Sequence, residues 1–255
     1  MSNEINCALS HVCKLAGTEQ CTRLCSDYIA FHGYSGDGGR LGAAGIPSDY
    51  RHVTLANSPA REDQAEIYRF LADYVPTFSR QFEPEGERIK SLYLYSREPG
   101  TGKTTTAVAL LNEWLVVHYV GSRQRGKRPL ERPAYFFDVN GWQKLYNKFN
   151  RPLVPKDVAE PASREYYRQE QLARTTPFVV MDDIGVRECT EGFRGDLHDT
   201  IDHRVTNGLT TVYTSNVKIE ELKRVFDARL ADRVRDMCAT LSFVGESKRG
   251  LRKMK

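Results

Sequence analysis

The stretch that most constrains the fold of this chain is residues 97–104, Arg-Glu-Pro-Gly-Thr-Gly-Lys-Thr. An apolar run at residues 92–95 precedes it and a helix-like run at residues 105–111 follows it. Strand, tight loop and helix in this order are the context that a phosphate-binding P-loop requires. Gly100 and Gly102 let the backbone approach an anion, which the loop N–H groups and the start of the helix attract.

Two side chains of this loop carry distinct roles. Lys103 is expected to face the β- and γ-phosphates of a nucleotide, and the Thr104 hydroxyl is expected to ligate Mg²⁺. Arg97 stands where the pattern G-x-x-x-x-G-K-T has glycine, which bears on nucleotide affinity. The alternative is a chance glycine-rich turn. The remaining nucleotide contacts of the loop are expected from Pro99, Gly100, Thr101, Gly102 and Thr105.

A second motif lies at residues 177–185, where an apolar run ends in Asp182 and Asp183. This is the Walker B arrangement, in which Asp182 would hold Mg²⁺ through water and Asp183 would orient or polarise the attacking water. Two adjacent acids at the end of a buried strand rarely serve packing alone, because an unpaired buried charge is costly.

Polar residues that follow these motifs complete a candidate catalytic set. A strand is predicted at residues 209–215, and Asn216 at its end can position the water, although an asparagine that ends a strand in a turn is the plainer interpretation. Arg229 and Arg233 lie four residues apart on one predicted helix face. Either could reach a neighbouring subunit's γ-phosphate. The alternative is a surface helix whose arginines pair with nearby acids, namely Asp227, Asp232 and Asp236.

The four cysteines Cys7, Cys13, Cys21 and Cys25 fall within the first 25 residues. In a chain without a recognisable export signal, such a cluster favours metal over a disulfide framework. Four thiolates suit tetrahedral Zn²⁺, and His11 or His32 could replace Cys7 as a ligand. Free or buried cysteines are the alternative, because no C-x2-C pair is present.

Composition bounds the remaining possibilities. The chain has 255 residues, 40% of them hydrophobic, and a formal net charge of +4, which permits a nucleic-acid partner without requiring one. No apolar run of about 18 residues is present, and the first residues do not form a signal peptide, so a cytoplasmic protein without a membrane partner is expected.

Two stretches are candidates for nucleic-acid contact. The loop at residues 121–129 carries four basic residues and is either a phosphate-backbone contact or a solvated loop. The predicted helix at residues 141–149 combines aromatic residues with lysines, a combination that suits stacking on single-stranded bases but is also common in a core. Its aromatic and basic members are Trp142, Tyr146, Phe149, Lys144 and Lys148.

From about residue 46 to the end, the chain resembles the AAA+ ATPases of the bacterial replicative-helicase loader family, the DnaC/DnaI type. The resemblance rests on PGTGKTT at residues 99–105, VVMDDIG at 179–185, TSN at 214–216, ARLADRV at 228–234 and GESKR at 245–249. It implies that Asn216 acts as sensor 1, Arg233 as the arginine finger and Arg249 as sensor 2. The cysteine segment also resembles that of DnaI-type and phage-type loaders, where it implies contact with the helicase.

The resemblance implies an α/β AAA+ P-loop ATPase core with a parallel central sheet and no helical lid domain, plus a small N-terminal zinc-binding segment. The expected organisation is a zinc segment at 1–45, a linker with an approach helix at 46–90 and the ATPase domain at 91–255. The expected function is the ATP- and Mg²⁺-dependent loading of a hexameric DnaB-type helicase onto single-stranded DNA, by a homo-oligomer on the helicase ring. Two alternatives remain: an IstB-type transposition helper ATPase, and an adaptor that binds ATP without hydrolysing it.

Overall fold

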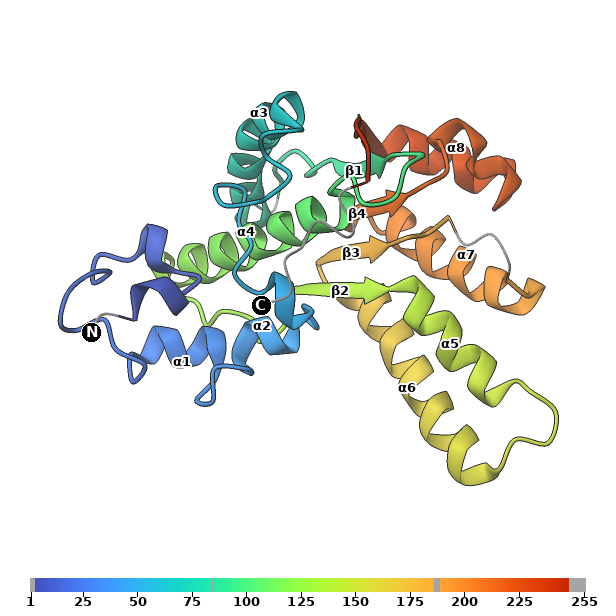
Figure 1. The fold of residues 1–255 in the computed structure, drawn as a ribbon, viewed down its shortest axis with the longest axis horizontal. Helices are drawn as coiled ribbons and strands as arrows, with labels where there is room; N and C mark the ends of the chain where they lie inside the picture. The colour runs from blue at the N-terminus through green and yellow to red at the C-terminus, as the bar shows by residue number, and fades with distance from the viewer. Residues whose placement is uncertain (1–2, 84, 186–188, 248–255) are drawn as a thin grey trace. The chain divides into compact units, whose positions relative to one another are not determined.

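The computed structural model describes residues 3–83, 85–185 and 189–247. Helices and strands alternate through the second half of the chain (Figure 1). The helices are α1 Ser26–His32, α2 Gly39–Ala43, α3 Ala65–Tyr74, α4 Lys103–Gln124, α5 Val139–Phe149, α6 Lys156–Thr175, α7 Glu191–Thr206 and α8 Ala228–Met237. The strands are β1 Ser91–Tyr95, β2 Ala134–Asp138, β3 Phe178–Asp182, β4 Thr210–Ser215 and β5 Cys238–Ser242.

The chain divides into two compact units that are not continuous in sequence. The first comprises Met1–Ile89 and Val108–Phe136, and the second comprises Lys90–Ala107 and Phe137–Lys255. The second unit therefore contains the P-loop, β3, β4 and the helices from α5 onward.

The strands form one sheet in the order β2-β3-β4-β1-β5, and the pairs β1–β4, β1–β5 and β3–β4 are parallel. The central strands β1, β3 and β4 are buried almost throughout, which explains why they read as continuous apolar runs rather than alternating ones. In such sheets, ligands bind outside the carboxyl ends of the strands. The predicted α/β fold with a parallel central sheet is confirmed.

Helices α5 and α6 run side by side as a hairpin in the second unit (Figure 1). Asp138 begins α5, because its carboxylate accepts a hydrogen bond from the Gly141 N–H. The hairpin is held by aromatic packing: the Trp142 ring stacks on Tyr166 with a centroid distance of 4.4 Å, and its indole N–H donates to the Tyr166 carbonyl at 3.0 Å.

Arg204 of α7 is the largest cation in the interior of the second unit, and none of its surface is exposed. Burial lowers its pKa to about 10, so it stays charged at neutral pH. Its guanidinium donates to the Thr211 hydroxyl and to the carbonyls of Ala173, Thr176, Pro177 and Thr210. A buried carbonyl without a donor costs about 1–3 kcal/mol, so Arg204 holds the end of α6 and the starts of β3 and β4 in register.

The first unit packs around buried apolar side chains such as Phe31, Leu71 and Phe78, and polar side chains fasten its loops to one another. Arg40 donates to the carbonyls of Ala30, Pro129 and Leu130. In its described N-terminal stretch, residues 3–25, Leu9 is the one buried apolar side chain. That stretch consists of turns and 3-10 helices and therefore has no apolar core of its own.

Within the described ranges, no helix combines the length and apolar character needed to cross a bilayer.

Candidate functional site

The loop between β1 and α4 has the backbone that its glycines predict. Gly100 and Gly102 have φ of 76° and 99°, a region that side-chain-bearing residues rarely enter. The helix begins at Lys103, so its first N–H groups face the loop. Arg97, at the departure from the usual pattern, is exposed and lies at the outside of the loop.

Lys103 is 9% exposed, and its ammonium lies at the carboxyl edge of the sheet. It donates to the carbonyls of Ser96 and Glu98 at 3.3 and 3.1 Å and to the Asn216 amide oxygen at 2.8 Å. The structure thus brings together the predicted P-loop lysine and the predicted sensor residue, because β4 lies directly beside β1.

Asp182 ends β3 and lies opposite the P-loop helix. Its Oδ1 accepts a hydrogen bond from the Thr104 hydroxyl at 2.9 Å and from the Thr214 hydroxyl at 2.7 Å. Burial raises the pKa of Asp182, whereas these two hydroxyl donors lower it. A carboxylate beside a hydroxyl is the hard-oxygen environment that Mg²⁺ prefers, so these residues fit the predicted magnesium site.

Asp183 has φ of 61°, a backbone conformation that is uncommon for residues with a side chain. Its backbone N–H donates to the Thr214 hydroxyl at 2.8 Å. Its Oδ2 accepts from the amide of Asn140 at 2.8 Å. Asn140 is not predicted by any motif, although its place just after β2 is a signal that could have found it.

Asn140 contacts one carboxylate oxygen of Asp183, Oδ2. Asn140 is exposed at the first turn of α5. The contact fixes the direction of the Asp183 carboxylate.

Arg233 of α8 is paired within its own chain. Its guanidinium forms an ion pair with Asp202 of α7 and donates to the Thr206 hydroxyl at 2.7 Å. Two of the three acids named as alternative partners contact other residues instead: Asp232 pairs with Arg235, and Asp227 caps α8 and contacts His198.

The other two arginines of the predicted set differ in what can be said of them. Arg229 is exposed one turn before Arg233 on α8. The predicted sensor 2 residue, Arg249, lies outside the described residues.

The predicted zinc ligands Cys7, Cys13, Cys21 and Cys25 are half-buried free thiols. Over the described ranges, no group of three or more His, Cys, Asp or Glu side chains is placed to hold a metal ion, so the structure does not confirm a zinc site. The thiols are nevertheless neighbours. Burial raises the pKa of Cys7 most, and the other three cysteines raise it further.

The prediction that Trp142 stacks on nucleic-acid bases is wrong. Its side chain is 0% exposed and packs between Tyr166 and Phe193, because residues of α6 and α7 cover that face of α5. Tyr146 and Phe149 are half-buried in the same aromatic cluster.

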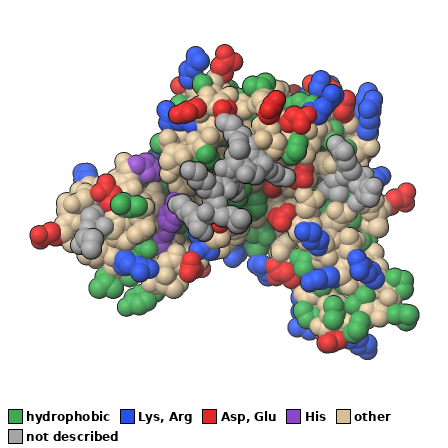
Figure 2. Space-filling view, viewed as in Figure 1, with side chains coloured by type: hydrophobic (Ala, Val, Ile, Leu, Met, Phe, Trp, Pro, Cys, Tyr) green, Lys and Arg blue, Asp and Glu red, His purple; other side chains and the backbone are tan. Residues whose placement is uncertain are grey.

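The outer part of the α5–α6 hairpin exposes both basic and hydrophobic side chains, which are gathered over it in Figure 2. Lys144 and Lys148 are exposed on α5, and Leu153 in the turn is fully exposed. The predicted basic loop is exposed as well, at Arg123, Arg125, Lys127 and Arg128.

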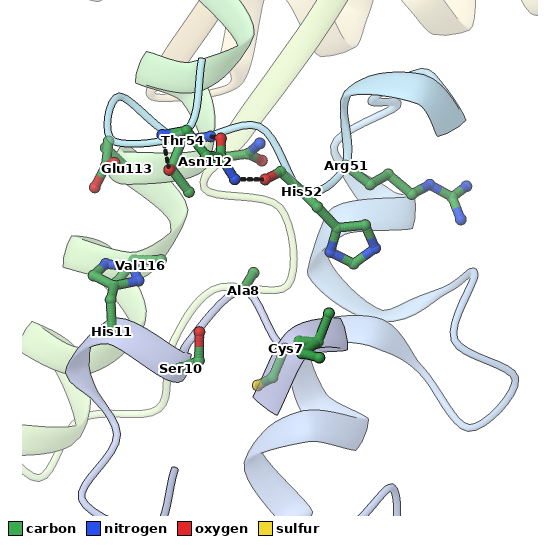
Figure 3. A pocket seen from close by; sticks show the side chains of 12 residues that line it. Cys7, Ala8, Ser10, His11, Arg51, His52, Thr54, Asn112, Glu113 and Val116 are labelled. Atoms are coloured by element: carbon green, nitrogen blue, oxygen red, sulfur yellow. Dashed lines mark hydrogen bonds between the residues drawn. The ribbon is translucent and has the colours of Figure 1, made fainter. Parts of the chain in front are cut away.

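A pocket of about 100 Å³ lies in the first unit and contains none of the residues predicted for the nucleotide (Figure 3). It is lined by parts of the N-terminal segment, residues 51–57 and the middle of α4. Asn112 of α4 closes one side, where its amide donates to the carbonyls of Tyr50 and Val53 at 3.1 and 2.8 Å. These bonds fasten the 50–53 loop to the helix.

Sequence comparison identifies a relative among replication proteins. No family model matches the chain. Over 192 residues it is 25% identical to the replicative helicase loader DnaI of Bacillus subtilis (strain 168), an alignment that covers 70% of this chain and 53% of that protein. The chain thus spans about half the length of the curated relative it matches. The predicted resemblance to helicase loaders is confirmed as homology to DnaI.

Solved structures share the fold. A crystal structure of DnaI has a TM-score of 0.53 at 18% identity and covers 80% of this chain and 94% of its own. A crystal structure of the DnaC helicase loader has a TM-score of 0.53 at 20% identity, and the match covers 78% of this chain and 100% of that one. The replication initiator DnaA, bound to AMPPCP and single-stranded DNA, has a TM-score of 0.50 at 14% identity, and the match covers 79% of this chain and 51% of that one.

Proposed function

We propose that this chain is an ATPase that loads a hexameric replicative helicase onto single-stranded DNA. The observation that carries the proposal is a cluster of polar side chains at the carboxyl edge of the sheet, contributed by the motifs typical of a P-loop ATPase. The members of the cluster are Lys103, Thr104, Asp182, Asp183 and Asn216. Homology to the loader DnaI supports the choice of helicase loading over other uses of such a site.

The chain's own residues would divide the work as follows. The loop N–H groups and Lys103 bind the phosphates, and Lys103 exchanges its present carbonyl partners for phosphate oxygens. Thr104 and Asp182 hold Mg²⁺, which when bound neutralises charge on the phosphate oxygens. Asp183 accepts a proton from the attacking water or orients that water, and Asn216 fixes its direction toward the phosphate.

Arg233 would act on the nucleotide of a neighbouring copy in a homo-oligomer on the helicase ring. Its chain already supplies Lys103 to its own site, so a second cation is more useful in trans. The pair with Asp202 is accessible, with the two side chains 31% and 39% exposed. An accessible ion pair is worth little free energy and can be exchanged for a phosphate.

Single-stranded DNA would be bound at the outer part of the α5–α6 hairpin. Lys144 and Lys148 offer charge there, and the edges of Tyr146 and Phe149 offer limited stacking. Trp142 takes no part, because it belongs to the core.

The N-terminal segment would contact the helicase. It exposes several large apolar side chains, an arrangement typical of a protein-binding surface. These are Ile5, Leu24 and Tyr34, which are 91%, 71% and 79% exposed.

Helicase capture tests the proposal directly. We expect the wild-type chain to retain a hexameric DnaB-type helicase in a pull-down and Leu24→Asp to weaken retention by about tenfold or more, because a charge enters an apolar contact. Leu153→Asp, at a fully exposed leucine of the α5–α6 turn, is the matched control and should retain the helicase. Failure of the wild-type chain to bind any such helicase would contradict the loader proposal.

Nucleotide binding and hydrolysis should separate in two variants. Lys103→Ala removes the cation that faces the phosphates, so ATP affinity should fall by about tenfold or more. Asp183→Asn keeps the shape but removes the base, so ATP should bind while turnover falls by about 100-fold. Fluorescence titration and phosphate release measure the two effects, with the exposed Lys127→Ala as control. Normal turnover by Asp183→Asn would exclude the assigned role.

The trans role of Arg233 can be tested by mixing variants. Arg233→Ala should bind ATP almost normally. Its turnover should fall by about 1,000-fold, the lower end of the rate effect of arginines that other phosphoryl-transfer enzymes receive from a neighbouring subunit or partner. Mixing it with Lys103→Ala should restore part of the activity, since some interfaces then pair an intact P-loop with an intact arginine. Arg235→Ala, an exposed arginine of the same helix, is the control. Unchanged turnover by a monomeric Arg233→Ala protein would rule out this role.

We also propose that the four N-terminal thiols gather on one Zn²⁺, because the segment has no apolar core to fold around. Elemental analysis should find about one zinc per chain. Cys21→Ser or Cys25→Ser should lose it, whereas Cys189→Ser should keep it. A fully folded protein that contains no metal would refute the zinc site.

A further inference from the structure

Thr214, near the end of β4, contacts three consecutive residues, namely the last residue of β3 and the two that follow it. Its hydroxyl donates to Asp182 Oδ1 at 2.7 Å and accepts from the Asp183 N–H at 2.8 Å. Its backbone carbonyl accepts from the Ile184 N–H at 3.0 Å. The side chain is 2% exposed, so these contacts are shielded from water.

The chemistry of the groups fixes the direction of each hydrogen bond. An ionised carboxylate can only accept and a backbone N–H can only donate. The Thr214 hydroxyl has one hydrogen and free lone pairs, and it meets both demands at once. Valine has the same shape but lacks the hydroxyl, so it can make neither hydrogen bond.

This contact takes over where regular strand pairing stops. The β3–β4 register ends at Met181 opposite Tyr213, one residue before Asp182. The chain then turns through Asp183, whose φ of 61° is strained for a residue with a side chain. Such strain persists only when the surroundings hold it. Thr214 holds the backbone of Asp183, and Asn140 holds its carboxylate.

We propose that Thr214 is a positioning residue that sets the placement of Asp182 against Asp183, and hence of the magnesium ligand against the catalytic base. The proposal rests on the ATPase function proposed above. The threonine hydroxyl contacts the Asp182 carboxylate and the Asp183 backbone N–H at once, so it fixes the carboxylate of the first acid relative to the backbone of the second.

Two substitutions of Thr214 separate the hydroxyl from the packing. Thr214→Val keeps the volume and removes the hydroxyl, whereas Thr214→Ser keeps the hydroxyl and removes a methyl group. Thr200→Val is the matched control, because Thr200 is a fully buried threonine of the same unit whose hydroxyl donates to the Asp196 carbonyl of its own helix.

Amide hydrogen exchange of the nucleotide-free protein gives a readout independent of activity. In Thr214→Val the Asp183 amide should exchange about tenfold faster, the factor that corresponds to one lost hydrogen bond. The Ile184 amide donates to a backbone carbonyl that valine retains, so its exchange should not change. Thr214→Ser and Thr200→Val should match the wild type at Asp183.

Mg²⁺-dependent ATP binding and turnover should rank the variants as the exchange rates do, with Thr214→Val impaired and Thr214→Ser close to the wild type. With a fluorescent ATP analogue, the Mg²⁺ concentration for half-maximal binding should rise about tenfold in Thr214→Val, while binding without Mg²⁺ stays the same. Turnover at saturating ATP should fall by about 10- to 100-fold, the effect of a small misplacement of a catalytic group, and serine should restore it.

Equal exchange at Asp183 in Thr214→Val and wild type, or equal Mg²⁺ dependence in the valine and serine variants, would overturn the role of Thr214. If the wild-type protein bound Mg²⁺-ATP without hydrolysing it, the proposed ATPase function would fail. The exchange and Mg²⁺ measurements would still decide whether Thr214 positions the two acids.

Discussion

The candidate site depends on one carboxylate oxygen, Oδ1 of Asp182, which accepts hydrogen bonds from two hydroxyls. Thr104 donates from the first turn of α4 and Thr214 donates from β4. Three segments that are far apart in sequence are thereby fixed at the carboxyl edge of one sheet. Lys103 of α4 adds a third connection, to Asn216 after β4. Every role proposed for the nucleotide site requires these segments to keep this spacing.

The interior supports that spacing at the opposite ends of the same strands. Arg204 binds carbonyls at the end of α6 and at the starts of β3 and β4, so the two strands that carry Asp182 and Thr214 begin from a common anchor. A cation that satisfies several carbonyls at once is costly to remove, because each carbonyl would be left buried without a donor. Strands β3 and β4 thus connect the carboxyl edge of the sheet, where the candidate nucleotide site lies, to the opposite edge, where Arg204 binds the carbonyls.

The sequence predicts those parts of the site that local chemistry determines. Glycines at positions 100 and 102 are required by a backbone with positive φ, and the apolar run before Asp182 can only be a buried strand in an α/β fold. The contacts between motifs are less visible. Asn140 follows β2 without any motif of its own, and the partner of Arg233 is Asp202 of another helix rather than an acid nearby in sequence. Trp142 shows the same limit, since aromatic spacing on α5 does not reveal that Tyr166 and Phe193 cover it.

If Asp182 and Thr104 hold Mg²⁺ as proposed, ATP binding at this site depends on magnesium. The most direct measurement is the affinity for ATP with and without Mg²⁺, in the wild type and in Asp182→Asn, which keeps the side-chain shape and removes the charge. We expect Mg²⁺ to tighten ATP binding by the wild type and to have little effect on the variant. An Asp182→Asn protein that retains the full effect of Mg²⁺ would contradict the proposal.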